Sequence, residues 1–165
     1  MRRSVALIAT VALTLPAAAS CRDDGGSPET GPAASTATTM APKTFADAVR
    51  AGDLEAMQAV FADDIELYSP VLADPFIGRD RVERLFAVLV DTFEDIEVTD
   101  EISSSDRFVL AFTARVEGEP IQVVDLLSFD DEGRIATFVV TARPLAGIQA
   151  LGAAVAPHLA EINST

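Results

Sequence analysis

The feature that most constrains the fold of this chain is a change in the spacing of its apolar residues near position 95. Between residues 80 and 93, apolar side chains recur three and four positions apart, which is the spacing of one helix face. From residue 96 to residue 143, apolar and polar residues mostly alternate, which is typical of strands. Helices followed by a run of strands favour an α+β fold with a strongly bent, largely antiparallel sheet packed on helices.

Capping and turn residues divide the first half into separate elements. Thr44 is expected to cap a short helix that ends at Gly52, and Asp53 to cap a second helix reaching residue 61. A strand is expected at 65–69 and a loop at 70–78. The next helix is expected to start at Asp80, with Glu83 completing a capping box.

The second half reads as a meander closed by a helix. Four strands are expected at about 96–102, 108–116, 121–129 and 134–143, with turns at 117–120 and 130–133. Pro144 suits the first turn of a helix. Its apolar side is expected to carry Leu145, Ile148, Leu151 and Val155.

Composition excludes several classes of function. The chain has 165 residues, enough for one domain, with 12 Lys and Arg against 26 Asp and Glu. From Thr44 onward, eight Arg face 23 acidic residues, a net charge of −15. Nucleic-acid binding is excluded, because phosphate contacts need basic side chains. One Cys and one His are too few for a usual zinc site, and no phosphate loop or Ser-His-Asp set occurs, so we expect no cofactor.

The N-terminus has the order of a secretory signal. Arg2 and Arg3 precede an 11-residue apolar run, which is shorter than the roughly 20 residues of a spanning helix. Small residues follow, and then Cys21, which resembles the lipidated Cys of bacterial lipoproteins. Ala18 stands where such signals usually carry Leu, so cleavage near Ala19 without lipidation is the alternative. We therefore expect secretion and a lipid anchor on Cys21, a tether at 21–43, a domain at 44–160 and a tail at 161–165.

One charged residue lies on the apolar face of a predicted strand. Within 121–129, Asp125 shares its face with Val123 and Leu127. A buried carboxylate must be paired, hydrogen-bonded or protonated. Arg115 and Arg143 are candidate partners in a structural ion pair. The alternative is an acid with a raised pKa that donates a hydrogen bond to a ligand.

Five segments carry a family resemblance. They are DLEA at 53–56, FADD at 61–64, SP at 69–70, PFIGR at 75–79 and VDLLSFDDEGRI at 124–135. In order and spacing they resemble the nuclear transport factor 2-like superfamily, and above all its SnoaL-like proteins and steroid Δ-isomerases. The resemblance covers residues 44 to about 159. It implies a cone-like bent sheet with an internal apolar pocket and, in many members, a homodimer formed through the outer sheet face.

The resemblance also allows the isomerase residues to be checked. It implies a general base at Ser69, an oxyanion-binding Tyr at Phe45 and a protonated Asp at Asp125, so one group of three is retained. A Ser does not abstract a carbon-bound proton unaided, so the family's isomerase mechanism is not expected. The epoxide hydrolases imply an Asp near Val140. The single His, His158, reads as a surface residue of the tail.

Aromatic residues on the predicted core faces are candidates for the pocket lining. The predicted pocket residues are Asp125, Tyr68, Ser69, Phe86, Phe112 and Phe138, and Phe76 is a further candidate. The same aromatic residues could be plain core. The acidic runs at 63–64 and 130–132 invite a calcium site, but their spacing favours solvated turns, so no metal is expected.

Three functions stay open on the sequence alone. The first is binding of a small apolar molecule by a lipid-anchored domain, with Asp125 as one polar contact. The second is an isomerase, hydratase or cyclase that uses Asp125 with a base such as Asp74. The third is an interaction module of the cell envelope that uses the outer sheet face.

Overall fold

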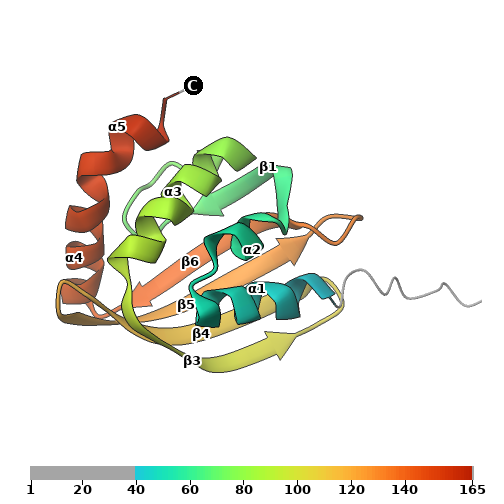
Figure 1. Ribbon diagram of the computed structural model, residues 1–165, viewed down its shortest axis with the longest axis horizontal. Helices are drawn as coiled ribbons and strands as arrows, with labels where there is room; N and C mark the ends of the chain where they lie inside the picture. Colours follow the sequence, from blue (N-terminus) through green and yellow to red (C-terminus); the bar gives the residue numbers. More distant parts are fainter. Residues whose placement is uncertain (1–39, 165) are drawn as a thin grey trace, which may run out of the picture. The chain divides into compact units, whose positions relative to one another are not determined.

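The computed structural model describes residues 40–164, so Cys21 and the signal-like segment lie outside the described residues. The described chain alternates early helices with two strands and then forms a four-stranded meander closed by helices (Figure 1). The elements are α1 Met40–Ala51, α2 Leu54–Gln58, β1 Phe61–Tyr68, β2 Phe76–Ile77, α3 Arg79–Thr92, β3 Glu94–Ser103, β4 Arg107–Val116, β5 Glu119–Phe129, β6 Ile135–Arg143, α4 Leu145–Val155, η1 Ala156–His158 and α5 Leu159–Ile162.

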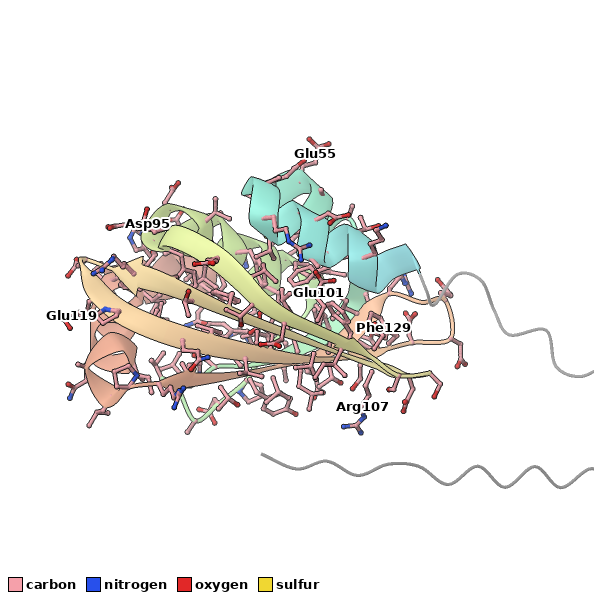
Figure 2. All side chains as sticks on the ribbon, turned by 90° about the horizontal axis from the view of Figure 1, so that it is seen from below. Glu55, Asp95, Glu101, Arg107, Glu119 and Phe129 are labelled. Atoms are coloured by element: carbon pink, nitrogen blue, oxygen red, sulfur yellow. The ribbon has the colours of Figure 1, made fainter. Side chains whose placement is uncertain are left out.

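The six strands form one open sheet in the order β2-β1-β6-β5-β4-β3. All neighbours are antiparallel except β1 and β6, which run parallel. The α+β prediction is confirmed, and the sheet is mixed because the first long strand adds beside the last one. Figure 1 shows α1, α2 and α3 lying over one face of the sheet, with α4 across its end. In Figure 2, β5 runs from Glu119 at one end of the sheet to Phe129 at the other.

The first two helices differ from the prediction at their ends. α1 begins at Met40, so Thr44 lies within the helix and does not cap it. The cap of α2 is confirmed, because the Asp53 carboxylate accepts a hydrogen bond of 3.0 Å from the Ala56 backbone N–H. Phe61 was expected at the end of this helix, but it opens β1, where it pairs with Ile135 and is fully buried.

The start of α3 is built differently from the predicted capping box. Gly78, with φ of 91°, is the N-cap residue and provides no side-chain cap. Glu83 instead accepts a 2.7 Å hydrogen bond from Arg79 Nε. The loop expected at 70–78 contains β2, whose Phe76 pairs with Leu67 of β1. Two residues are too few to show an alternating pattern, which explains why the sequence did not reveal this strand.

The meander follows the prediction closely. The turn between β4 and β5 is tighter than expected, because Glu117 and Gly118 both take positive φ, 51° and 81°. Glu119 therefore already pairs with Val116. β3 contains register shifts near its start and at Asp100, where the simple alternation fails.

The C-terminal helices extend the core along one end of the sheet. Leu151, Val155 and Ile162 are buried, whereas Leu145, expected on the same side, is 68% exposed. The stretch Leu145–Ile162 is long and apolar enough to cross a membrane by length and composition, with mean hydropathy 1.3. Core helices share this property, and the buried side chains of this stretch belong to the domain core.

Candidate functional site

Asp125 lies on the inner face of the sheet, as its position in the alternating pattern predicts. It pairs with Leu110 on β4 and Val140 on β6. Val123 and Leu127 flank it along β5, and both are buried. Its own side chain is 5% exposed, and it is the one polar or charged residue buried among the described residues.

No described residue donates a hydrogen bond to the Asp125 carboxylate or forms an ion pair with it. The two Arg expected as partners are engaged elsewhere. Arg115 Nη1 donates to the Gly118 carbonyl at 2.8 Å, and Arg143 Nε donates to the Gln122 side chain at 2.5 Å. Both Arg are exposed on the other face of the sheet. The structural ion pair is therefore wrong for these partners.

Burial without a partner determines the charge state of this carboxylate. Removal from water disfavours the ionised form, and it raises the pKa of Asp125 to about 8. At pH 7 Asp125 is mostly protonated. A protonated acid can donate one hydrogen bond, and an ionised one can balance a cation.

A cavity of about 80 Å³ opens beside Asp125, between the inner face of the sheet and the helices. Its walls come from all the main elements of the described domain. The lining residues are apolar apart from Asp125 and the half-buried Ser69, which directly follows β1. Leu72, in the β1–β2 loop, lines the cavity while 36% exposed, so this loop forms part of the opening.

The structure brings most of the predicted pocket residues together at this cavity. Asp125, Ser69, Phe86, Phe112 and Phe138 line it, and so does Phe76. Tyr68 does not, because it points to the outer face, is 39% exposed and donates a 2.7 Å hydrogen bond to Glu66. Tyr68 is the last residue of β1 and follows the inward-facing Leu67, and successive strand residues face opposite sides. The prediction for Tyr68 is therefore wrong.

Several lining residues were recognised in the sequence only as core. Phe45 and Val49 of α1, Leu89 of α3, and Leu151 and Val155 of α4 all contact the cavity. Their helical spacing predicts burial but gives no indication of which buried residues face an empty space. Val90 and Phe93 at the end of α3 complete this side.

The other candidate groups lie away from the cavity. Asp74 is exposed in the β1–β2 loop and is not a lining residue, and His158 is exposed on η1. Ser69 does line the cavity, but its Oγ accepts a hydrogen bond from the Val71 N–H at 3.2 Å, a local turn contact. Asp130 accepts hydrogen bonds from Glu132 and Arg134 within its turn. Across residues 40–164, no group of acidic, His or Cys side chains is placed to hold a metal ion.

A comparison of the sequence with known protein families also supports this fold. Residues 43–138 match the SnoaL-like domain family. The chain belongs to this family. The resemblance noted from the five sequence segments is thereby confirmed. No curated protein matches the chain.

Solved structures place this SnoaL-like chain among proteins of the same fold. A steroid delta-isomerase from Pseudomonas aeruginosa is 28% identical, with a TM-score of 0.71, covering 76% of this chain and 93% of that one. An uncharacterised bacterial protein with a cystatin-like fold from Silicibacter pomeroyi is 22% identical, with a TM-score of 0.70, covering 76% and 89%. A protein with a ketosteroid isomerase-like fold from Catenulispora acidiphila, 17% identical, has a TM-score of 0.52 over 67% and 90% and was solved in complex with trimethylamine. One protein of this fold has thus been solved with a small molecule bound.

Proposed function

We propose that this SnoaL-like domain binds a small apolar molecule in its internal cavity, with Asp125 as the main polar contact. The observation that carries the proposal is the unpartnered Asp125 carboxylate at an apolar cavity. A buried polar group without a partner costs free energy, so it persists where a ligand uses it. The cavity supplies apolar surface, and the single acid supplies orientation.

The cavity volume limits the size of the ligand. An apolar protein cavity of about 150 Å³ accommodates benzene, with six heavy atoms. By the same scale, of about 25 Å³ per heavy atom, about 80 Å³ accommodates roughly three heavy atoms, and the opening at Leu72 leaves room for more. The half-exposed Leu72 at the opening gives a longer ligand a path toward solvent.

Two neighbouring valines of β6 provide a matched test of cavity binding. Val140 lines the cavity, whereas Val139 precedes it on the strand and faces the outer side. Ligand-observed NMR with a panel of small neutral and cationic compounds should detect binding to wild type and to Val139→Phe. Val140→Phe, which fills the cavity, should abolish it. Equal signals from the two variants, or none from wild type, would contradict cavity binding.

Catalysis is the second candidate, and the likeness to the Pseudomonas isomerase favours it. No titratable side chain besides Asp125 lines the cavity within residues 40–164. An isomerase, hydratase or cyclase reaction would therefore use Asp125 as its one acid or base. Turnover of a cavity ligand by wild type, lost in Asp125→Asn, would establish this reading. Turnover that survives Asp125→Asn would exclude Asp125 as the reacting group.

We propose in addition that the domain is anchored to the cell membrane from outside through lipid on Cys21. The support is the sequence alone, since Cys21 lies outside the described residues. The intact mass of the membrane-extracted protein should exceed the polypeptide mass by the acyl groups. Cys21→Ala should release the protein from the membrane fraction, and a membrane-bound Cys21→Ala would contradict the proposal.

A homodimer through the outer sheet face is the assembly we propose. Register pairs place one apolar residue of each long strand in a row across this face: Tyr68, Val139, Leu126, Val109 and Ile102. Tyr68 and Ile102, at the two ends, are 39% and 62% exposed. A second copy would cover this row. Sedimentation should give a dimer for wild type and a monomer for Leu126→Lys, and a monomeric wild type would favour the interaction-module alternative.

A further inference from the structure

The lining of the cavity can carry one negative charge, when Asp125 is ionised, and has no positive charge to balance it. Asp125 is its one titratable side chain, and no Lys, Arg or His is among the lining residues of the described domain. α1, α2, α3, α4, β4 and β6 all contribute lining residues, and none of these is ionisable. Nothing contributed by the protein therefore neutralises Asp125 when it is ionised.

Aromatic rings make up much of the remaining wall. Six phenylalanines line the cavity: Phe45, Phe76, Phe86, Phe93, Phe112 and Phe138. Phe45, Phe86 and Phe138 pack edge-to-face, with ring centroids 5.5 to 6.2 Å apart. The faces of aromatic rings are electron-rich and attract cations, most strongly where water is excluded.

The end of α3 adds partial negative charge on one side of the cavity. Leu89, Val90 and Phe93 belong to the last turn and C-cap of this helix, and all three are lining residues. The carbonyl end of a helix carries a partial negative charge that favours cations. The C-terminal end of α3 thus has the same sign of charge as ionised Asp125.

The chain just outside this wall is acidic as well. Asp91, Glu94 and Asp95 are exposed beside the lining residues of α3 and β3, and none forms an ion pair within the described residues. Asp95 lies where β3 leaves α3 (Figure 2). Arg115 is the cross-strand partner of Glu94, but its guanidinium donates to the Gly118 carbonyl. With a net charge of −15 from Thr44 onward, the domain attracts cations and repels anions.

Building on the proposed function, we propose that the ligand is a small apolar monocation, an amine or a quaternary ammonium, whose charge is balanced by the Asp125 carboxylate and the phenylalanine rings. The cavity encloses roughly three of its heavy atoms, and the rest would lie in the opening at Leu72. An anion would be repelled by ionised Asp125, by the C-terminal end of α3 and by the acidic residues outside the cavity. A neutral oxygen compound would use the hydrogen bond of protonated Asp125 and the apolar surface, but would gain no electrostatic attraction from the rings or from α3.

The two ligand classes require opposite protonation states of Asp125. In the empty cavity burial raises the pKa of Asp125 to about 8. A cation binds the ionised form, so its binding at pH 7 releases one proton, and its affinity increases with pH up to about 8. A neutral acceptor binds the protonated form, so its affinity decreases as the pH rises through 8.

The test compares two probes of similar shape on the full-length chain. Tetramethylammonium and tert-butanol each have five heavy atoms, and tetramethylammonium has no proton to lose, so its pH dependence reports the protein alone. Binding is measured by NMR titration at pH 6 and pH 9, using the methyl signals of Val140 and Leu89 to localise it. The variants are Asp125→Asn and, as a matched control that also removes one acid, Asp100→Asn on the exposed part of β3.

The proposal expects tetramethylammonium to bind wild type at least tenfold more tightly at pH 9 than at pH 6. Asp125→Asn should abolish most of this affinity and all of its pH dependence, and Asp100→Asn should stay within about twofold of wild type. If tert-butanol binds in the cavity and tetramethylammonium does not, or if Asp125→Asn leaves the tetramethylammonium affinity unchanged, the cation proposal is overturned while cavity binding stands. If neither probe binds, nor any compound of the panel above, the proposed function is overturned as well.

Discussion

Asp125 of β5 lies directly opposite Leu110 of β4, a side chain with no exposed surface. On the other side, its partner on β6 is Val140. An acid is therefore set between two aliphatic residues at the centre of the sheet, where a residue such as Val would give an ordinary core. When this buried acid is ionised, it lowers the free energy of unfolding of the domain.

The contribution of Asp125 to the stability of the domain should fall as the pH rises from about 4 to about 8. The pKa of Asp125 is raised from 3.8 to about 8 by burial, so between these values the folded state binds a proton that the unfolded state has released. The contribution is fully present below pH 3.8 and is lost as the pH rises through 8. A shift of this size corresponds to a free energy of unfolding on the order of 5 kcal/mol. Urea denaturation from pH 5 to pH 9 measures it.

Asp125→Asn is the control for this pH dependence, because it keeps the shape of the side chain and removes its titration. The difference in unfolding free energy between wild type and Asp125→Asn should change with pH, in favour of the variant at pH 9. The other carboxylates contribute equally to both proteins. A difference that stays constant across this range would show that Asp125 titrates normally.

Arg79 should be a stabilising residue that Lys does not replace. Its Nη2 and Nη1 donate to the carbonyls of Gln58 and Phe61 at 3.0 and 3.1 Å, and its Nε pairs with Glu83. The guanidinium thus joins the start of α3 to the end of α2 and the start of β1. Lys has one ammonium group and does not form these three contacts together, so Arg79→Lys should cost about 1 to 3 kcal/mol in denaturant unfolding.

Arg107 offers the matched control for Arg79. It lies at the start of β4 and points away from the sheet (Figure 2), with a single ion pair to Asp106 at 4.0 Å. Arg107→Lys should change stability by less than about 0.5 kcal/mol. If the two Arg→Lys substitutions cost the same, the half-buried carbonyl contacts of Arg79 contribute nothing of their own.

Asp53 should contribute to stability through its cap of α2. The carboxylate accepts the Ala56 N–H at 3.0 Å, a backbone donor that would otherwise lack a helical partner. Asp53→Ala should cost about 1 kcal/mol, whereas Asp53→Asn, which also caps helices, should cost little. Thermal unfolding of the two variants distinguishes a cap from a charge effect, since an equal loss in both would indicate that the charge matters.

The fold could be predicted largely from the period of apolar residues, and the failures have local causes. Strands β4 to β6 could be predicted to within a few residues of their bounds. One face of each is buried, so apolar and polar residues alternate along it. β2 was missed, since Phe76 and Ile77 are too few to alternate. Thr44 and Asp80 have the residue types of helix caps, but the helices begin at Met40 and Arg79. At α3 the glycine at position 78 occupies the N-cap position, which a capping pattern does not reveal.

The site was predicted in part for the same reason. Asp125 stood out because a carboxylate on an apolar strand face breaks a pattern that the rest of the strand obeys. The sequence did not show which groups Arg115 and Arg143 bind. Their side chains face the outer side of the sheet, where the Gly118 carbonyl and the Gln122 side chain accept their hydrogen bonds. Tyr68 was placed at the cavity through its residue type, although its neighbour Ser69 is the residue that faces inward.

Two glycines of α4 should respond to Ala in opposite directions. A Cβ on Gly147 would lie 2.7 Å from the Pro120 carbonyl oxygen and 2.9 Å from Ile121 Cβ, so the helix would have to move away from β5. A Cβ on Gly152 would meet Val71 at 3.5 Å, which is ordinary contact. Gly147→Ala should therefore cost about 1 to 3 kcal/mol through overpacking, while Gly152→Ala should gain about 0.5 to 1 kcal/mol from helix propensity.

The same pair reports on the cavity, because Leu151 and Val155 of α4 form part of its wall. Displacement of α4 in Gly147→Ala should shift the NMR methyl signals of both residues and weaken ligand binding. Gly152→Ala should preserve both the signals and the binding. Chemical denaturation and NMR on the two variants test the relationship together. Equal stability of the two variants would show that the close approach of α4 to Pro120 does not hold the helix in place.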